Sequence, residues 1–250
     1  MASLPPDLSA NVALVTGAAR RIGRAIALAL AGQGARVIVH YRSSAADARG
    51  LVEQIRSAGG QAECLQADLA DVAAAAALMD RACGPFGPVD ILVNNASIFP
   101  ADALTDFTPE GLYGSINVNA LSPLMLGRAM AARGAAGQIV NLLDGRIADY
   151  DRAHAAYHLS KRMLFTLTRM MALEFAPRIQ VNAVAPGLIL PPTGQDESFL
   201  RRLASTNPLR RHGDVSDVAD AVLYLVGADF VTGQVIYVDG GRHMTGAVYG

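Results

Sequence analysis

A tyrosine and a lysine four residues apart are the pair in this chain best suited to acid-base chemistry. They are the first and last residues of the run Tyr157-His158-Leu159-Ser160-Lys161. The chain contains twenty arginines but only one lysine, Lys161. In a helix, residues i and i+4 share one face. A positive charge about 4 Å from the phenol, at an effective dielectric of about 20, is worth roughly 4 kcal/mol and would lower the phenol pKa of about 10 by up to roughly 3 units. Tyr157 would then exchange protons near neutral pH; a buried tyrosine beside a snorkelling surface lysine is the alternative.

Two more polar residues fall where an open α/β fold holds its ligands. Asp144 follows the apolar run 138–143, and a polar residue that ends such a strand lies at the carboxyl edge of the sheet. Asn119 lies in the run 116–120. Asn119, Asp144, Tyr157 and Lys161 therefore form the candidate catalytic group. For Asp144, a hydrogen bond to a nearby loop is the alternative role.

A glycine turn follows the first apolar run of the chain, 12–16, and leads into a helix predicted at 25–33. In this turn, Gly17 permits a tight bend and Gly23 permits close packing of the helix, whose N-terminus can receive a pyrophosphate. An ordinary βα turn would use the same residues. The turn is nevertheless followed by a second strand, 35–41, where a dinucleotide-binding unit requires one.

The second strand ends in Arg42-Ser43-Ser44 and not in a carboxylate. An Asp or Glu at this place would accept a hydrogen bond from a ribose 2′-hydroxyl, whereas a basic residue with two hydroxyls suits a 2′-phosphate. The sequence therefore favours NADP(H) over NAD(H).

The remaining pattern predicts a single α/β domain over residues 11–250, a doubly wound Rossmann-like parallel sheet of about seven strands, after a tail at 1–10. Asp68, beyond the third strand, could accept from an adenine amino group or cap a helix. Residues 188–213 hold few apolar runs and are a candidate substrate lid. The other helices are expected at about 45–58, 71–83, 109–133, 153–176 and 215–227, and the other strands at 61–67, 89–94, 138–143, 178–184 and 234–238.

Composition narrows the class of partner to a small molecule. The net charge is −1 and no basic tract is present, which argues against nucleic acid or an acidic membrane surface. Cys64 and Cys83 have no metal-ligand spacing and are expected to be reduced core residues. No signal-like segment opens the sequence and no apolar run approaches about 20 residues, so we expect a cytoplasmic protein. We also expect no metal site, because the sequence shows no metal-ligand spacing.

A set of short motifs runs along the chain: Thr16-Gly17 through Gly23, Asp68, Asn94-Asn95-Ala96, Asn119, Tyr157 with Lys161, Pro186-Gly187 and Asp239-Gly240-Gly241. In these motifs, from about Asn11 to Gly241, the sequence resembles the short-chain dehydrogenase/reductase family. The resemblance implies that Tyr157 transfers the proton, that Lys161 binds the nicotinamide ribose and tunes Tyr157, and that Asn119 supports a water relay. It also suggests a homotetramer assembled through the helices at about 109–133 and 153–176.

Two departures from the usual family pattern resemble the pteridine reductases. Arg21 stands at the usual middle glycine of the nucleotide turn, and Asp144 stands at the usual catalytic serine. The runs 40–44 and 95–99 are also similar to those enzymes. In them the arginine reaches the cofactor phosphates and the substrate, and the phenylalanine at the position of Phe99 stacks the pterin against the nicotinamide.

The residues and the resemblance together predict an NADPH-dependent reductase of dihydropterin, dihydrofolate or a related pteridine, with the proton delivered through Tyr157. The predicted substrate residues are Arg21, Ser97, Phe99, Asp144 and Tyr157. The predicted cofactor residues are Gly17, Arg20, Arg21, Ile22, Gly23, Tyr41, Arg42, Ser43, Ser44, Asp68, Leu69, Asn95, Ala96, Ser97, Lys161, Pro186 and Gly187. A general NADPH-dependent carbonyl, quinone or 3-oxoacyl reductase is the main alternative. A nucleotide-sensing or scaffold protein without turnover is the third.

Overall fold

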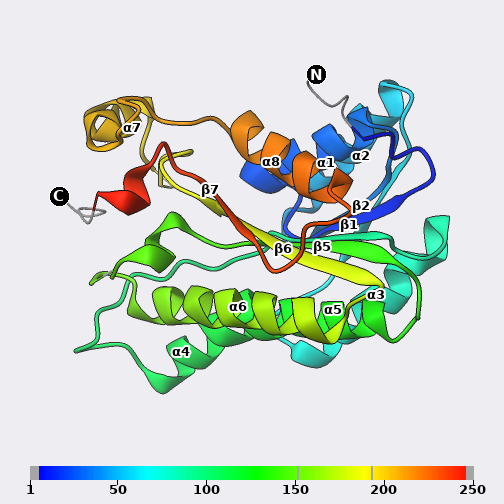
Figure 1. The fold of residues 1–250 in the computed structure, drawn as a ribbon, viewed down its shortest axis with the longest axis horizontal. Helices are drawn as coiled ribbons and strands as arrows, with labels where there is room; N and C mark the ends of the chain where they lie inside the picture. The colour runs from blue at the N-terminus through cyan, green and yellow to red at the C-terminus, as the bar shows by residue number, and fades with distance from the viewer. Residues whose placement is uncertain (1–5, 151, 193, 246–250) are drawn as a thin grey trace.

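The computed structural model describes residues 6–150, 152–192 and 194–245, which form one seven-stranded parallel sheet between two layers of helices (Figure 1). The strand order is β3-β2-β1-β4-β5-β6-β7. The predicted fold class is therefore confirmed. The strands are β1 Val12–Val15, β2 Arg36–Tyr41, β3 Ala62–Gln66, β4 Ile91–Asn94, β5 Gly137–Leu142, β6 Ile179–Pro186 and β7 Val235–Val238.

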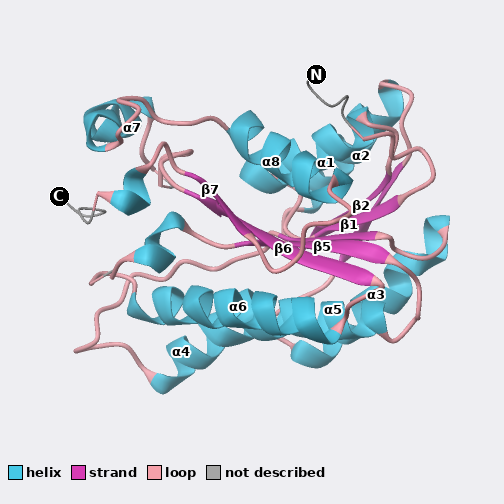
Figure 2. Cartoon of the chain, in the orientation of Figure 1, coloured by secondary structure: helices cyan, strands magenta, loops and turns pink. Residues whose placement is uncertain are grey.

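Helices cover both faces of the sheet, so the central strands are apolar on both sides (Figure 2). One face carries α1 (Arg21–Gly32), α2 (Ala45–Ser57) and α8 (Val215–Gly227), and α1 packs against α8. The other face carries α3 (Val72–Phe86), α4 (Pro109–Ile116), α5 (Ser122–Ala131) and α6 (Ala155–Glu174).

The direction of the strand order reverses at β1, which pairs with both β2 and β4. In register, Val15 of β1 lies opposite Val39 of β2 and Val93 of β4. The connections that follow β1 and β4 leave the sheet on opposite faces, which opens a crevice beyond the carboxyl ends of these strands. Open α/β sheets bind their ligands in such a crevice.

The helix predicted at about 109–133 is interrupted, which corrects that expectation. Between α4 and α5 lies a π-helical turn, Asn117–Leu121, in which the N–H of Ser122 bonds to the carbonyl of Asn117. Pro123 has no N–H and cannot make the next ordinary helical bond. A wider turn at this point accommodates the missing donor, and π-turns of this kind occur often at functional sites.

The structure adds detail to three other expectations. The described part of the N-terminal tail packs against the sheet layer, since Leu8 is buried and its N–H donates to Gln33 O at 2.8 Å. Cys64 and Cys83 are free thiols but only half-buried at the edges of the core. Within segment 188–213 the chain forms α7 (Glu197–Leu203) and a short 3-10 turn, Ala204–Thr206.

No helix in the described part of the chain is long and apolar enough to cross a bilayer.

Candidate active site

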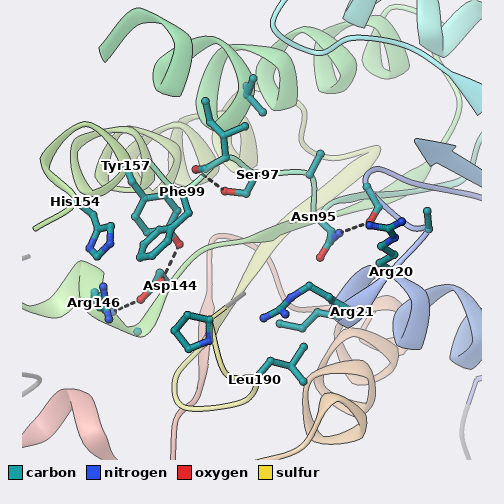
Figure 3. A pocket seen from close by; sticks show the side chains of 18 of the residues that line it. Arg20, Arg21, Asn95, Ser97, Phe99, Asp144, Arg146, His154, Tyr157 and Leu190 are labelled. Carbon is teal, nitrogen blue, oxygen red and sulfur yellow. Dashed lines mark hydrogen bonds between the residues drawn. The ribbon is translucent and has the colours of Figure 1, made fainter. Parts of the chain in front are cut away.

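A cavity of about 970 Å³ lies along the carboxyl ends of the strands and contains most of the predicted site residues (Figure 3). The nucleotide turn and the end of β2 belong to this lining, and Figure 3 shows Arg20 and Arg21 on the opposite side of the view from Asp144 and Tyr157. Gly23, Asn119, Lys161 and Pro186 lie outside its lining. The predicted residues that do line it are Gly17, Arg20, Arg21, Ile22, Tyr41, Arg42, Ser43, Ser44, Asp68, Leu69, Asn95, Ala96, Ser97, Phe99, Asp144, Tyr157 and Gly187.

The nucleotide turn is held in a shape that only glycine fits at two positions. Gly17 has φ +62°, and a Cβ there would lie 2.9 Å from Ala96 Cα. A Cβ on Gly23 would lie 2.5 Å from Gly17 O. The side-chain amide of Asn95 stabilises the turn by donating to Thr16 O at 2.9 Å and to Gly17 O at 3.1 Å. Gly23 therefore acts through close packing, and Asn95 joins the turn to β4.

His40 also supports this turn, and its role was not evident from the sequence. Its Nδ1 accepts from the N–H of Gly17 at 3.0 Å, and its Nε2 lies 3.2 Å from Ala67 O. Burial lowers the pKa of the His40 imidazole to about 4. The ring is therefore neutral near pH 7, and a neutral ring can accept at one nitrogen while it donates at the other.

Arg21 takes the backbone conformation of the glycine that it replaces. Its φ is +55°, in the left-handed region that residues with a Cβ rarely adopt. Its guanidinium donates to Pro191 O at 2.8 Å, so it spans from the nucleotide turn to segment 188–213. The neighbouring Arg20 pairs with Asp47 at 2.6 Å, and both side chains are exposed.

The candidate catalytic group meets where α6 passes the end of β5. The Tyr157 hydroxyl donates to Asp144 Oδ2 at 2.7 Å, and the other Asp144 oxygen accepts from the N–H of Arg146 at 2.8 Å. Lys161 lies 5.7 Å from the centroid of the Tyr157 ring, and its ammonium donates to Leu142 O at 2.7 Å. The tyrosine and lysine thus share one helix face as the spacing predicts, and Asp144 contacts the phenol directly.

Lys161 is buried, and burial lowers the pKa of its ammonium from 10.5 to about 8 while nearby Asp144 acts in the opposite direction. The folded protein therefore binds this proton less tightly than the unfolded chain does. It follows that stability rises with pH between about 8 and 10.5.

Replacement of Lys161 with Met should remove this pH dependence. Urea unfolding of both proteins at several pH values should show the stability of the wild type rising relative to Lys161→Met, by up to about 3 kcal/mol across the window. Arg169→Met, at an exposed position of the same helix, is the control and should show no such trend. A stability difference that does not vary with pH would assign Lys161 an ordinary pKa.

Asn119 is fully buried and ties the loop after β4 to α6. Its amide accepts from the N–H of Ile98 at 2.9 Å, donates to Ile98 O at 3.0 Å and donates to Ser160 Oγ at 2.9 Å. Ser97 Oγ also donates to it at 3.1 Å. This geometry gives Asn119 a positioning role for the loop that carries Ser97 and Phe99; the water relay remains a prediction.

Phe99 forms a half-exposed aromatic surface beside the candidate catalytic group. Its ring stacks on His154 with centroids 3.9 Å apart and meets Tyr157 edge-on at 4.5 Å. The Arg146 guanidinium carbon lies 5.6 Å from the same ring. Arg146 and His154 were not predicted from the sequence, although Arg146 lies two residues after Asp144 and His154 lies three before Tyr157.

Two other parts of the lining were also missed. From segment 188–213 come the apolar residues Leu188, Leu190, Pro192, Phe199 and Leu203, and from the turn after β7 come Asp239, Arg242 and His243. In the described residues, no cluster of three or more His, Cys, Asp or Glu could hold a metal ion.

The family model described as enoyl-(acyl carrier protein) reductase matches residues 17–243. The chain belongs to the short-chain dehydrogenase/reductase family. It is therefore an oxidoreductase by family.

Curated members of the short-chain dehydrogenase/reductase family with similar sequences include two ketoacyl reductases. The chain is 37% identical to the granaticin polyketide synthase putative ketoacyl reductase 2 of Streptomyces violaceoruber, over 98% of this chain and 100% of the relative. It is 36% identical to the 3-oxoacyl-(acyl-carrier-protein) reductase FabG of Staphylococcus aureus, over 93% and 98%.

Solved structures with the same fold include another kind of enzyme. FolM alternative dihydrofolate reductase 1 from Brucella canis, complexed with NADP, has a TM-score of 0.91 and 34% identity over 96% of each chain. A blue fluorescent protein from a metagenomic library, in complex with NADPH, has a TM-score of 0.87 and 35% identity over 95% of this chain and 99% of that one.

Proposed function

We propose that this protein is an NADPH-dependent reductase of pteridines, acting on a dihydropterin, dihydrofolate or a related molecule. The observation that carries the proposal is the hydrogen bond of 2.7 Å from the Tyr157 hydroxyl to Asp144, next to the half-exposed ring of Phe99. A flat, electron-poor heterocycle with hydrogen-bonding edges needs an aromatic face and a polar edge side by side. Phe99 can supply the face, and Asp144, Tyr157 and Ser97 can supply the edge.

The other end of the cavity suits a dinucleotide with a 2′-phosphate. Helix α1 has no side-chain cap at its N-terminus, so its first N–H groups are available to a pyrophosphate, and Gly17 lets that group approach the backbone. Arg42, Ser43 and Ser44 would hold the 2′-phosphate, Asp68 and Leu69 the adenine, and Lys161 the nicotinamide ribose. The other residues of the proposed cofactor site are Arg20, Arg21, Ile22, Gly23, Tyr41, Asn95, Ala96, Ser97, Pro186 and Gly187. NADPH bound there supplies a hydride to the substrate.

The protein's own part in the reaction is to position the ring and deliver one proton. Tyr157 donates its hydroxyl proton to the reduced centre, and the buried Lys161 stabilises the resulting phenolate. Before transfer, the ionised carboxylate of Asp144 accepts the phenol hydrogen bond and favours the protonated form of Tyr157. A reductase must deliver a proton, so this arrangement suits reduction better than oxidation.

The solved FolM structures support a pteridine substrate, whereas the ketoacyl reductases among the relatives support the alternative of a general carbonyl reductase. NADPH oxidation should be followed with dihydrobiopterin, dihydrofolate, biopterin, a quinone and an oxoacyl thioester. Turnover of the dihydropterin or dihydrofolate well above the quinone and thioester is the expected result. The reverse order would overturn the proposal and favour the carbonyl reductase.

Replacement of Arg42 with Ala should weaken the binding of NADPH but not that of NADH. Arg42 lines the cavity at the end of β2, where the sequence Arg42-Ser43-Ser44 contains no carboxylate. A lost charge-assisted contact to the 2′-phosphate should raise the KM for NADPH about 10-fold and change that for NADH little. Steady-state kinetics with both cofactors measures this. An equal rise in KM for both cofactors, or a wild type with no preference for NADPH, would contradict the role of Arg42 in binding the 2′-phosphate.

Replacement of Phe99 with Ala should impair substrate binding with little loss of stability, because the ring is 47% exposed. We expect a KM for dihydropterin about 3- to 10-fold higher, as loss of an aromatic contact costs roughly 0.5–1.5 kcal/mol. The melting temperature should fall by only a few degrees. A large fall in melting temperature with an unchanged KM would assign Phe99 to the core.

We also propose that the protein assembles as a homotetramer through α4, α5 and α6. In support, Tyr113 of α4 and Met170 and Leu173 of α6 are large apolar side chains that are 62%, 59% and 84% exposed. Light scattering of the purified protein tests this proposal.

A further inference from the structure

The loop after β4, which carries Phe99, is joined to the N-terminus of α6 by a single residue, Asp102. The backbone N–H of Asp102 donates to Ala153 O at 2.9 Å, and its carbonyl accepts from the N–H of Ala155 at 3.1 Å. Its side chain adds a third bond, because Asp102 Oδ1 accepts from the N–H of Ala156 at 3.0 Å. Asp102 therefore holds together two segments that lie 54 positions apart in the sequence.

Asp102 caps α6 from outside the helix. The side chain of His154, the N-cap residue, does not cap the helix. The first N–H groups of a helix have no partner within it, and the helix dipole favours a negative charge beside them. The carbonyl and the carboxylate of Asp102 accept from the first two of these groups, on Ala155 and Ala156. A residue of the loop after β4 thus fixes the start of the helix that carries Tyr157.

The other side of the Phe99 segment is also held. Asn119 bonds both backbone groups of Ile98, at 2.9 Å to the N–H and 3.0 Å to the carbonyl. Only Phe99, Pro100 and Ala101 lie between Ile98 and the bonds made at position 102, and proline has a fixed φ. The backbone on which the Phe99 ring stands is therefore fixed before any ligand binds, which lowers the entropy lost on binding.

These bonds set the Phe99 ring relative to the tyrosine. The ring stacks on His154 at 3.9 Å and meets Tyr157 edge-on at 4.5 Å, and both partners belong to the first turn of α6 or its cap. Asp102 itself is not among the residues that line the cavity. Any effect of Asp102 on the substrate therefore passes through the residues that it holds in place.

We propose that Asp102 is a positioning residue for the substrate: it fastens the loop after β4 to α6, so that a flat ring stacked on Phe99 lies in a fixed place relative to the Tyr157 hydroxyl. The inference rests on the proposed pteridine reductase function, in which Phe99 supplies the aromatic face and Tyr157 the proton. Proton transfer needs hydrogen-bond distance, so movement of the ring relative to the hydroxyl impairs both stacking and catalysis.

Replacement of Asp102 with Ala should lower kcat/KM for dihydrobiopterin about 3- to 10-fold, the effect expected for loss of a helix cap. The KM for NADPH should change far less. Asp102→Asn keeps an acceptor oxygen and is a good capping residue, so it should restore most of the activity lost in Asp102→Ala. Asp106→Ala is the matched control, because Asp106 lies in the same loop and accepts from the N–H of Ala103 at 2.7 Å; it should leave kcat/KM within about twofold.

A double-mutant cycle separates positioning from a general loss of stability. If Asp102 acts through Phe99, Asp102→Ala should change kcat/KM for dihydrobiopterin by less than about twofold in a Phe99→Ala protein. Three results would each overturn the inference while leaving a pteridine reductase. These are an equal effect in both backgrounds, an Asp102→Asn variant as impaired as Asp102→Ala, and a KM for NADPH that rises as much as kcat/KM falls.

Hydrogen exchange of the wild type needs neither a variant nor turnover. Without ligand, the amides of Ile98, Asp102 and Ala156 should exchange at least about 10-fold more slowly than that of Leu104, an exposed residue of the same loop. Fast exchange at positions 98 and 102 that slows only when substrate binds would show that the substrate orders the loop, and would overturn the inference. Absence of pteridine turnover in the wild type would overturn the proposed function and this inference with it.

Discussion

Tyr157→Phe should abolish most pteridine turnover while the protein still folds and binds its ligands. The substitution removes one hydroxyl and keeps the ring that meets Phe99 edge-on at 4.5 Å. General acid catalysis is commonly worth about 10²–10⁴-fold, so kcat should fall by at least about 100-fold. Single-turnover measurements with NADPH and dihydropterin report this fall directly.

Tyr224→Phe is the matched control, because Tyr224 is an exposed tyrosine on α8 that lies outside the cavity lining. It should keep wild-type turnover. Dihydropterin affinity, measured by fluorescence quenching, should change less than about 3-fold in Tyr157→Phe, since the hydroxyl contributes about one hydrogen bond. A kcat within a few-fold of the wild type would exclude Tyr157 as the proton donor.

Asp144→Ser should restore the constellation usual in the family and yet lower dihydropterin turnover by at least about 10-fold. Serine carries no charge at neutral pH and cannot accept the phenol hydrogen bond as a carboxylate does. It can still accept from the N–H of Arg146, because serine is a good residue at such a cap, so the turn at residues 145–148 should survive. Any gain in activity should be for ketones.

Asp144→Asn separates charge from shape in the same experiment. Asparagine keeps the size and one acceptor oxygen but loses the negative charge, so its kcat for dihydropterin should also fall and its pH profile should change. The measurement is kcat for dihydropterin and oxidised pterin from pH 5 to 8. Unchanged rates in both variants across this range would make the carboxylate a structural cap and favour the general carbonyl reductase.

Much of the fold follows from local pattern and could be predicted. The seven strands appear as short apolar runs, because a parallel strand covered on both faces leaves no polar side. The order of strands and helices along the chain then specifies a doubly wound sheet, since parallel strands need crossover helices. The pairing of Tyr157 with Lys161 also follows from sequence, because residues i and i+4 meet on a helix of any tertiary context.

Other features depend on contacts between distant segments and could not be predicted. The pattern alone did not show that the helix predicted at about 109–133 opens into a π-turn at Asn117–Leu121. Asn119 lies in this turn and hydrogen-bonds both backbone groups of Ile98 and the side-chain hydroxyl of Ser160. The neutral state of His40 arises from burial beside Gly17 and Ala67, which are 23 and 27 residues away.

The strands, the nucleotide turn and the tyrosine–lysine pair could be predicted from the sequence, because each is marked by residues close together in the chain. The residues that surround them come from distant segments and are brought there by the tertiary fold. His154 stacks on Phe99 across 55 positions, Arg21 reaches Pro191 across 170, and the turn carrying Arg242 packs beside Arg146. These contacts depend on how the loops beyond the strands fold back over one sheet edge, and loop conformation is set by long-range packing and not by local propensity.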